Sequence, residues 1–224
     1  MRGNFINTKY RGVEQNVWDF NSCKTESMRG KSNFSFVLIP GPELPLELYS
    51  HCMLDIGNNN YLIIGGLTKD DKKLPEEVLF YNMNTGFWTL GPKLAFGRVE
   101  HSCGILQNPD DKSIFAVVVG GIGSTGHLDS VEVLEIDLEN GMVEGAEWFE
   151  GPNLPVGLGN HDSVVVDNAL YTFGGDTEEN FNKVSYKLSY EQGSWVWSTW
   201  GETAFPRWLL AAMEVPDEIV NCEQ

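Results

Sequence analysis

The chain repeats one pattern, which in its second copy runs Gly91-Pro92-Lys93-Leu94 … His101 … Val117-Val118-Val119-Gly120-Gly121. The first copy runs from Gly41 through His51 to Gly65-Gly66, and the third runs from Gly151 through His161 to Gly174-Gly175. In each copy the His stands ten residues after the first Gly, and an apolar run ends at the Gly pair. The period of 50 to 60 residues predicts an architecture of stacked repeats.

Each copy is expected to form four short antiparallel strands. The third strand of the second copy, Val131–Leu138, alternates apolar side chains such as Leu134 and Ile136 with acidic ones, which is the pattern of a half-buried strand. Turn residues suited to positive φ, such as Asn58-Asn59 and Asp167-Asn168, separate first strands from second strands. We find no helical period of useful length, so the prediction is an all-β fold.

The two ends of the chain hold incomplete copies. Val13–Asn21 and Asn33–Ile39 look like the last two strands of a copy whose beginning is missing. At the other end, Phe205-Pro206-Arg207 matches Phe96-Gly97-Arg98, which places Leu210 at the His position. Trp208–Val215 is therefore expected to be a first strand, and Ile219–Cys222 the start of a second. Four strands cannot bury an apolar face alone, so the copies are expected to stack as sheets around an axis.

A tryptophan follows each Gly pair, at Trp88, Trp148 and Trp197, and an Arg precedes the second His by three residues at Arg98. With these features the chain resembles the kelch repeat family of β-propellers over residues 13–222. In that family the Gly pair ends the second strand and the Trp lies in the fourth. The resemblance implies a single propeller domain over residues 1–224. It implies three complete four-stranded blades at about 41–90, 91–150 and 151–200, with partial blades at 13–40 and 201–224.

Two forms of this kelch-type β-propeller remain open, a partial propeller and a closed four-bladed ring. Kelch-like propellers usually have about six blades, which favours the partial propeller. Such an arc leaves sheet edges open, and open edges are expected to promote self-association.

The repeated residues have a structural interpretation. Gly65, Gly66, Gly120, Gly121, Gly174 and Gly175 are expected where positive φ or close backbone approach excludes a Cβ atom. The three tryptophans are expected to pack between adjacent sheets. Equivalent His side chains of neighbouring blades lie too far apart to share one small ion, so each His is expected to be buried with a backbone partner rather than in a metal ring.

Composition narrows the classes of partner. The net charge is −17, from 32 acidic and 15 basic residues, which disfavours nucleic acid and suits basic partners. The sequence has no apolar stretch of 18 residues and no apolar core near its start, so neither a membrane span nor a signal peptide is expected. A cytoplasmic location is favoured, while the sequon Asn33-Phe34-Ser35 keeps secretion open. Cys52 and Cys103 are expected to be small apolar strand residues.

Function is expected to reside in loops. The sequence shows no Cys/His cluster, nucleophile elbow or phosphate-binding loop, so no metal, cofactor or catalytic residue is predicted. Thr68–Pro75, Ile122–Ser130 and Asp176–Phe181 each follow a Gly pair and should emerge on one face, where variable loops commonly bind partners.

The preferred hypothesis is a non-catalytic protein-interaction module, because the resemblance implies scaffolding or adaptor roles. The alternative is a propeller enzyme, or a small-molecule or sugar-binding protein, that uses the central channel. The candidate partner-binding residues are Thr68, Lys69, Asp70, Arg98, Ser124, His127, Asp176, Glu178 and Glu179.

Overall fold

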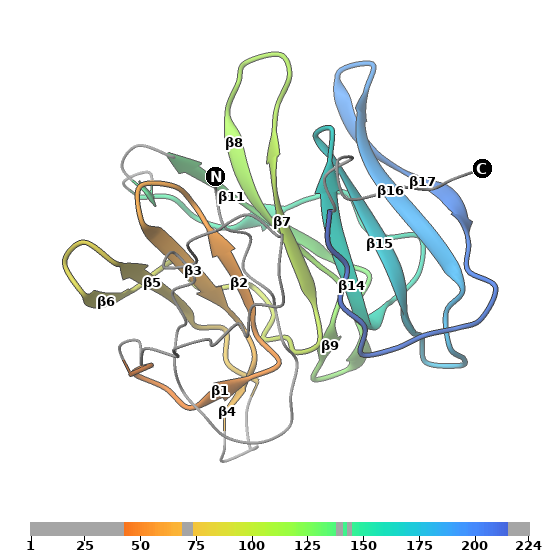
Figure 1. The fold of residues 1–224 in the computed structure, drawn as a ribbon, viewed down its shortest axis with the longest axis horizontal. Coiled ribbons are helices and arrows are strands. Elements are labelled where there is room, and N and C mark those ends of the chain that lie inside the picture. Colours follow the sequence, from red (N-terminus) through yellow and green to blue (C-terminus); the bar gives the residue numbers. More distant parts are fainter. Residues whose placement is uncertain (1–42, 69–73, 138–140, 143–144, 215–224) are drawn as a thin grey trace, which may run out of the picture.

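The computed structural model describes residues 43–68, 74–137, 141–142 and 145–214. Regular structure in these ranges is entirely β, which confirms the all-β expectation. Besides two small two-stranded sheets, the described residues form three larger antiparallel sheets that follow one another along the chain, and we call them blades 1, 2 and 3 (Figure 1). Within the described ranges, no helix has the length and apolar character needed to cross a membrane.

The strands of each blade pair in chain order. Blade 1 consists of β2 (Cys52–Asp55), β3 (Asn60–Ile64), β5 (Val78–Asn82) and β6 (Phe87–Leu90). Blade 2 consists of β7 (Ser102–Gln107), β8 (Ile114–Val119), β11 (Val131–Asp137) and the short β12 (Gly141–Met142) and β13 (Phe149–Glu150). Both β12 and β13 pair with β11, so the fourth strand of blade 2 is split. Blade 3 consists of β14 (Gly159–Val166), β15 (Ala169–Asp176), β16 (Val184–Glu191) and β17 (Ser194–Glu202).

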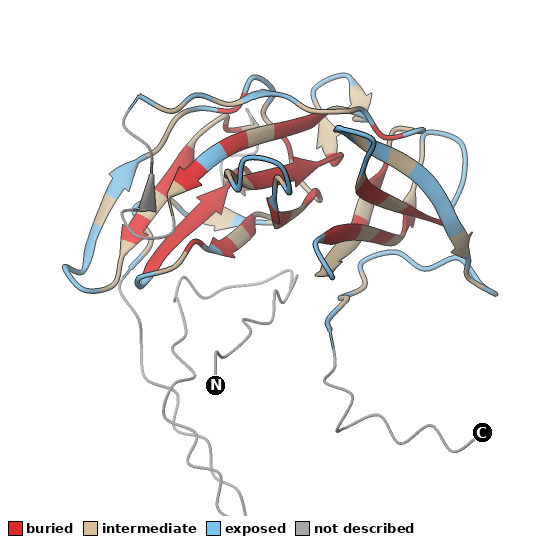
Figure 2. Ribbon diagram, turned by 90° about the horizontal axis from the view of Figure 1, so that it is seen from above, coloured by how far each residue is buried: buried red, intermediate tan, exposed pale blue. Residues whose placement is uncertain are grey.

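The blades lie side by side as an open fan, with buried residues between them (Figure 2). Strand β8 shows how the packing works, because its alternate side chains serve two cores. Ala116 and Val118 pack towards blade 1, whereas Val117 and Val119 pack towards blade 3. This explains the continuous apolar run before each Gly pair, since a strand covered on both faces loses the polar alternation. Full burial of each large aliphatic side chain stabilises the stack by about 1.5–3 kcal/mol.

The Gly pair joins one blade to the next. Gly120 and Gly121 have φ values of +58° and +98°. The amide of Gly121 donates to the carbonyl oxygen of Leu158, which leads into blade 3, at 2.8 Å. A Cβ atom on Gly121 would lie 2.7 Å from the Cβ of His101. The pair therefore has the backbone role expected from the sequence.

The repeated His positions also connect blades. The Nε2 atom of His101 donates to the carbonyl oxygen of Ile64 in blade 1 at 3.0 Å, which confirms a buried His with a backbone partner. The Nε2 atom of His161 lies 2.8 Å from the hydroxyl of Ser102 in blade 2. Burial lowers the pKa of His51 to about 4, so this ring is neutral near pH 7.

The residue before each His position has a left-handed backbone, which the sequence did not predict. The φ values are 55° at Ser50, 52° at Glu100, 53° at Asn160 and 50° at Leu209. The amides of Glu100, Asn160 and Leu209 each donate to the carbonyl oxygen of the equivalent residue in the preceding copy. The last of these bonds joins Leu209 to Asn160 at 3.0 Å. Leu209 thus continues the series, which supports the alignment of Leu210 with the His position.

Two tryptophans fix the fourth strands by hydrogen bonds as well as by packing. The indole of Trp148 donates to the carbonyl of Pro92 at 2.9 Å, and that of Trp197 donates to the carbonyl of Pro152 at 2.8 Å. Trp88 packs instead against the ring of Tyr81, with 4.5 Å between centroids. Each of the three rings is half-buried, as expected of side chains at the edge of a blade contact.

The end of the chain differs from its sequence prediction. Strand β17 extends to Glu202, and the expected first strand at Trp208–Val215 does not form over the described residues 208–214. In that segment the Ala212 amide donates to the carboxylate of Asp162 at 2.8 Å rather than to a strand ladder. A lone first strand has no neighbour to continue the sheet, so it stays irregular.

Several predicted elements lie outside the described residues. They are the partial blade at 13–40, the loop residues Lys69 and Asp70, and the second strand at Ile219–Cys222.

The cysteine prediction needs correction. Cys52 of β2 and Cys103 of β7 form a disulfide between blades 1 and 2, with their Cα atoms 6.2 Å apart. The first strands of adjacent blades bring the two residues together, although 51 positions separate them in the sequence. Disulfides persist mainly in oxidising compartments, so this pairing weighs against the cytoplasmic expectation.

Reduction of this disulfide is expected to destabilise the protein by about 2–4 kcal/mol, because the unfolded chain regains the freedom of a long closed loop. Thermal unfolding with and without a phosphine reductant measures the loss. Cys52→Ser should show the same lowered midpoint and should be insensitive to the reductant. A wild type whose midpoint does not respond to complete reduction would contradict the prediction.

Candidate functional site

One end of the blades carries the loops that follow the Gly pairs. We call it the loop face, and it is formed by β1 (Leu48–Tyr49), β4 (Leu67–Thr68), β9 (Ile122–Gly123), β10 (Gly126–His127) and residues 176–183. Figure 1 places β1, β4 and β9 at the same lower end of the fan. The connections into blades 2 and 3 reach the same end, since Val99 bridges to Ile122 and the amide of Leu158 donates to the carbonyl oxygen of Leu128 at 3.1 Å.

His127 ties the loops of blades 2 and 3 together. The His127 amide donates to Oε1 of Glu178 at 2.7 Å, and its Nδ1 lies 3.1 Å from the same oxygen. Its Nε2 lies 3.6 Å from Asp176, whose Oδ1 accepts a hydrogen bond from the side chain of Asn160 at 2.8 Å. A Cβ atom on Gly157 would lie 2.7 Å from the His127 carbonyl oxygen, so the backbone at His127 packs closely against the connection into blade 3. The two loops therefore form one preorganised surface.

Among the described candidate partner-binding residues, the structure brings three into direct contact. His127, Asp176 and Glu178 form the contact just described. Ser124 and Glu179 are exposed on the same two loops, whereas Thr68 lies apart on blade 1 and is half-buried.

Arg98 is a correction to the candidate set, because it is fully buried. Its guanidinium donates to the carbonyl oxygens of Gly120 at 2.8 Å and Ser130 at 3.0 Å, and it forms an ion pair with Glu132. Burial lowers the pKa of Arg98, and the nearby carboxylate of Glu132 opposes this shift. Such a group holds the connection into blade 2 and is not accessible to a partner.

Sequence reasoning missed the exposed aromatic side chains of the loop face. Phe96, Phe181 and Phe205 are exposed, as is Trp208 at 49%. The rings of Phe181 and Trp208 meet edge to face, with centroids 4.6 Å apart. They come from different connections, so only the folded chain reveals that they form a pair.

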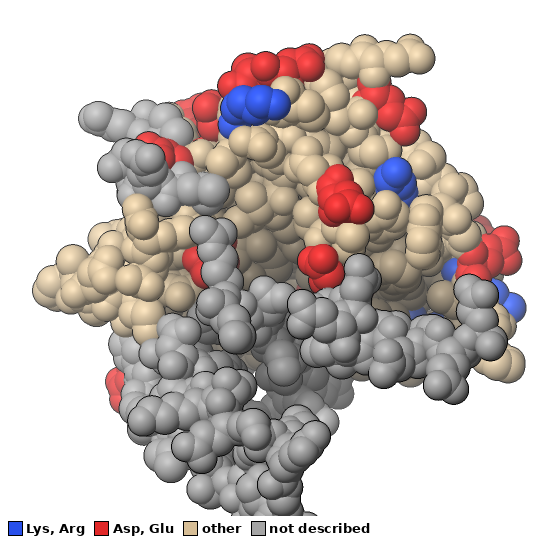
Figure 3. Space-filling view, turned by 45° about the horizontal axis from the view of Figure 1, so that its top comes forward, with Lys and Arg blue, Asp and Glu red and all other residues tan. Residues whose placement is uncertain are grey.

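Charge alone does not distinguish the loop face. Figure 3 shows acidic side chains spread over another view of the molecule, some of them beside a basic one. The opposite hairpin ends are joined too, since the hydroxyl of Tyr190 donates to Asp110 at 2.6 Å. In the part of the chain that the structure describes, no group of three or more His, Cys, Asp or Glu side chains is arranged to hold a metal ion.

A Ser–His pair on the first strands invites a catalytic interpretation. The hydroxyl of Ser102 lies 2.8 Å from Nε2 of His161 and 2.6 Å from the hydroxyl of Ser163. Ser102 is 1% exposed and His161 is 0% exposed, so no substrate atom can reach the hydroxyl without rearrangement. The pair serves the contact between blades 2 and 3.

Acid is expected to loosen the His127–Glu178 contact. The hydrogen bonds from the His127 amide and ring hold the pKa of Glu178 below its usual 4.5. A carboxyl whose pKa is lower in the folded state than in the unfolded state stabilises the fold. This stabilisation is complete at pH values above the unfolded-state pKa and is lost as the pH falls through the folded-state pKa. Glu178→Gln should therefore lower the unfolding midpoint at pH 7, and its midpoint should approach that of wild type as the pH falls below 4.5 and through the lowered pKa of Glu178.

Thermal unfolding from pH 7 to pH 3 tests this, with Glu179→Gln as the matched control. Glu179 is exposed on the same turn, and its carboxamide variant should follow wild type throughout. A gap between Glu178→Gln and wild type that stays constant with pH would show that ionisation of this carboxyl is not involved.

Comparison with curated proteins finds relatives named for the same repeat. Kelch repeat-containing protein 2 of Saccharomyces cerevisiae is 28% identical over 147 residues, covering 61% of this chain and 16% of that protein. Kelch-like protein 41b of Danio rerio is 25% identical over 175 residues, covering 76% and 27%. Kelch repeat and BTB domain-containing protein 12 of Homo sapiens is 26% identical over 176 residues, covering 68% and 26%. The chain thus spans between 16% and 27% of the length of these relatives.

No family model matches the chain. Among solved structures, one titled "Structure of YjhT" superposes with a TM-score of 0.56 at 14% identity, covering 78% of this chain and 61% of that chain. At this identity the likeness concerns the fold, which is that of a β-propeller.

Proposed function

Since the chain is built of kelch repeats, we propose that it is a non-catalytic module that binds another protein through its loop face. The observation that carries the proposal is the surface held by His127. Its loops are fixed to one another by hydrogen bonds, while Ser124, Glu179 and Phe181 on them remain exposed. A rigid frame that presents exposed polar and aromatic side chains pays little ordering entropy on binding.

The polar groups on the first strands argue against a catalytic channel as the main function. Ser102, His101 and His161 are buried and hydrogen-bonded within or between blades. Cys52 and Cys103 are bonded to each other. These groups stabilise the blade contacts, whereas the exposed aromatic side chains at the loop end resemble the anchors of protein interfaces.

Charge reversal on the loop face is expected to weaken partner binding without loss of stability. Glu179→Lys changes an exposed side chain, so its unfolding free energy should stay within about 0.5 kcal/mol of wild type. Its association with a basic partner should slow, because charges at the rim of an interface steer encounter.

Affinity capture from a lysate of the source cells compares how much partner protein wild type and Glu179→Lys retain, with Glu135→Lys as the control. Glu135 is exposed on β11, away from the residues of the loop face, and gives the same change in charge. Equal capture of the same proteins by wild type and by both variants would reject the loop face as the binding surface.

A further inference from the structure

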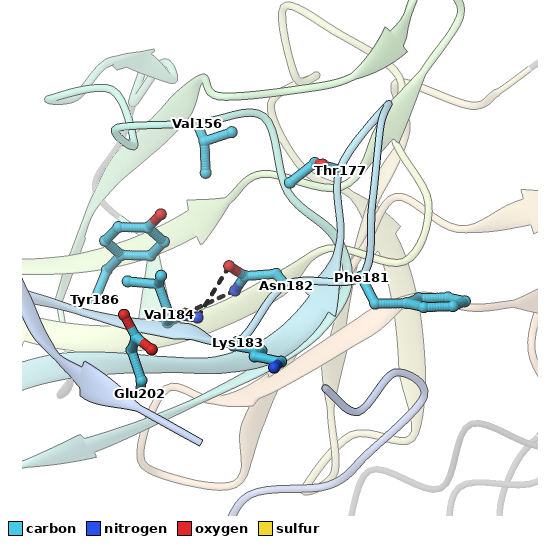
Figure 4. Close-up of a pocket in the computed structure, with 8 residues that line it drawn as sticks. All are labelled: Val156, Thr177, Phe181, Asn182, Lys183, Val184, Tyr186 and Glu202. Carbon is cyan, nitrogen blue, oxygen red and sulfur yellow. Dashed lines mark hydrogen bonds between the residues drawn. The ribbon is translucent and has the colours of Figure 1, made fainter. Parts of the chain in front are cut away.

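Blade 3 carries a groove at the loop face. It has a volume of about 400 Å³ and is lined by Val156, Thr177, Phe181, Asn182, Lys183, Val184, Tyr186 and Glu202. In Figure 4, Val156 lies across the groove from Lys183 and Glu202, and Phe181 stands at its edge. The lining combines apolar and aromatic side chains with a few polar and charged ones, a combination also found in recognition pockets.

The groove lies where blade 2 holds its buried ion pair. In the sheet register, Tyr186 pairs with Thr172 just as Glu132 pairs with Val118 two residues before the Gly pair. Tyr186 therefore occupies in blade 3 the position of Glu132 in blade 2. By the same spacing from the His position, Leu158 replaces Arg98.

The exchange of that pair for Leu158 and Tyr186 changes the chemistry of the site. In blade 2 the amides of Ala95 and Phe96 donate to Glu132, and Arg98 fills the region beneath them. In blade 3 the residue equivalent to Ala95 is Pro155, which has no amide hydrogen to donate. Blade 3 has thus replaced an internal charge pair by the buried, uncharged side chains of Leu158 and Tyr186, and Tyr186 lines the groove.

One hydrogen bond made by Arg98 in blade 2 has an equivalent in blade 3, where a different side chain donates it. The amide group of Asn182 donates to the carbonyl of Gly174 at 2.9 Å and to that of Val184 at 2.7 Å. It takes the place of the guanidinium that donates to Gly120 in blade 2. Asn182 is therefore fixed in the groove wall by hydrogen bonds to two backbone carbonyls.

The groove walls suit an aromatic or bulky aliphatic side chain. Phe181 is 53% exposed, and its contact with Trp208 extends the aromatic edge beyond the groove. The phenol of Tyr186 is neutral near pH 7 and can donate a hydrogen bond, and burial raises its pKa further. An apolar side chain entering here would cover aromatic surface that is now in water.

Charged residues at the rim of the groove determine which sign of charge on a bound segment is favoured. Glu202 and Lys183 lie on the rim with opposite signs. The adjoining turn adds the exposed carboxylates of Glu178 and Glu179, so negative charge predominates. We propose that this groove binds an extended segment of a partner protein in which a bulky apolar side chain is flanked by Lys or Arg. The proposal rests on the proposed function and specifies its site and the chemistry of its partner.

Two labelled synthetic peptides test the proposal by fluorescence anisotropy with the full chain. One has a central Phe flanked by Arg and Lys, and the other has the same Phe flanked by two Glu. We expect the basic peptide to bind at least about tenfold more tightly, since like charges at an interface are strongly unfavourable. Phe181→Ala and Glu202→Lys should each weaken it at least about fivefold by removing an anchor or a charge partner.

Phe96→Ala is the matched control, because Phe96 is an exposed loop-face aromatic in blade 2 that lies outside the groove. Its affinity for the basic peptide should equal that of wild type. Equal binding of both peptides, absence of binding up to millimolar concentration, or indifference to both groove variants would each overturn the proposal.

The capture experiment with Glu179→Lys separates this inference from the proposed function. If that variant loses the natural partner while Phe181→Ala and Glu202→Lys retain it, the groove is wrong and the loop face stands. If Glu179→Lys and the groove variants all retain the natural partner, neither the groove nor the loop face is the binding surface.

Discussion

Gly120→Val is expected to unfold the contact between blades 2 and 3. The residue has φ +58°, a backbone conformation that costs an L-residue about 1–2 kcal/mol. A Cβ atom there would lie 2.6 Å from the carbonyl oxygen of Leu158 and 3.0 Å from the ring of His161. Because the oxygen belongs to backbone that is itself hydrogen-bonded, it cannot withdraw cheaply, and overpacking adds about 1–3 kcal/mol. The total of about 2–5 kcal/mol is a large part of the 5–15 kcal/mol that keeps a typical domain folded.

Two control variants separate the causes of this loss. Gly86→Val has a similar φ of +72° but no atom within 4 Å of the new Cβ, so it reports the backbone cost alone. Gly201→Val has neither a positive φ nor a close neighbour and should be near wild type. Chemical denaturation should rank Gly120→Val well below Gly86→Val, with Gly201→Val highest. If Gly120→Val and Gly86→Val lose equal stability, close approach between blades is not what the Gly pair provides.

The repeated pattern predicts most of the fold because each of its residues has a local reason. Gly120 needs a special backbone conformation, and the apolar run before it needs cover on both faces. Trp197 stands in β17 and Trp148 directly before β13, and from both positions a large half-buried ring reaches the preceding connection. Such roles depend on residues at a fixed spacing along the chain. They therefore recur in every copy and can be predicted from the sequence.

The pairing of Cys52 with Cys103 could not be predicted in this way. It depends on which residues of two first strands face each other, and these strands are related by stacking rather than by hydrogen-bonded register. The left-handed conformation of Glu100 and Leu209 is hidden for a similar reason, since neither residue type favours it. It is imposed by hydrogen bonds between successive blades.

The candidate site was predicted only in outline. That His127 and Glu178 lie in loops of the same face follows from their place after the Gly pairs, but their direct contact does not. Arg98 was misjudged because a charged residue next to a loop is usually exposed, whereas here Glu132 from a strand more than 30 positions away neutralises it. In blade 3 the uncharged Leu158 and Tyr186 take the place of this pair, and Tyr186 lines the groove there.

Arg98→Leu should therefore be among the most damaging single substitutions, at about 3–5 kcal/mol, because it leaves a buried carboxylate without its counter-ion. Glu132 is 4% exposed, so water cannot replace the guanidinium. Blade 3 indicates the compensating change, since Leu158 and Tyr186 occupy the two equivalent positions there. Glu132→Tyr in the Arg98→Leu background removes the stranded charge and should recover at least about 1 kcal/mol relative to the single variant.

A double-mutant cycle by chemical denaturation measures this coupling. Recovery should be incomplete, because the amides of Ala95 and Phe96 lose the carboxylate that accepts their hydrogen bonds. Both residues are exposed, so water can satisfy these amides in part. If the double variant is as unstable as the sum of the two single variants, Arg98 and Glu132 are not coupled. The stability of blade 2 would then rest on packing alone, and the comparison between blades 2 and 3 would lose its physical basis.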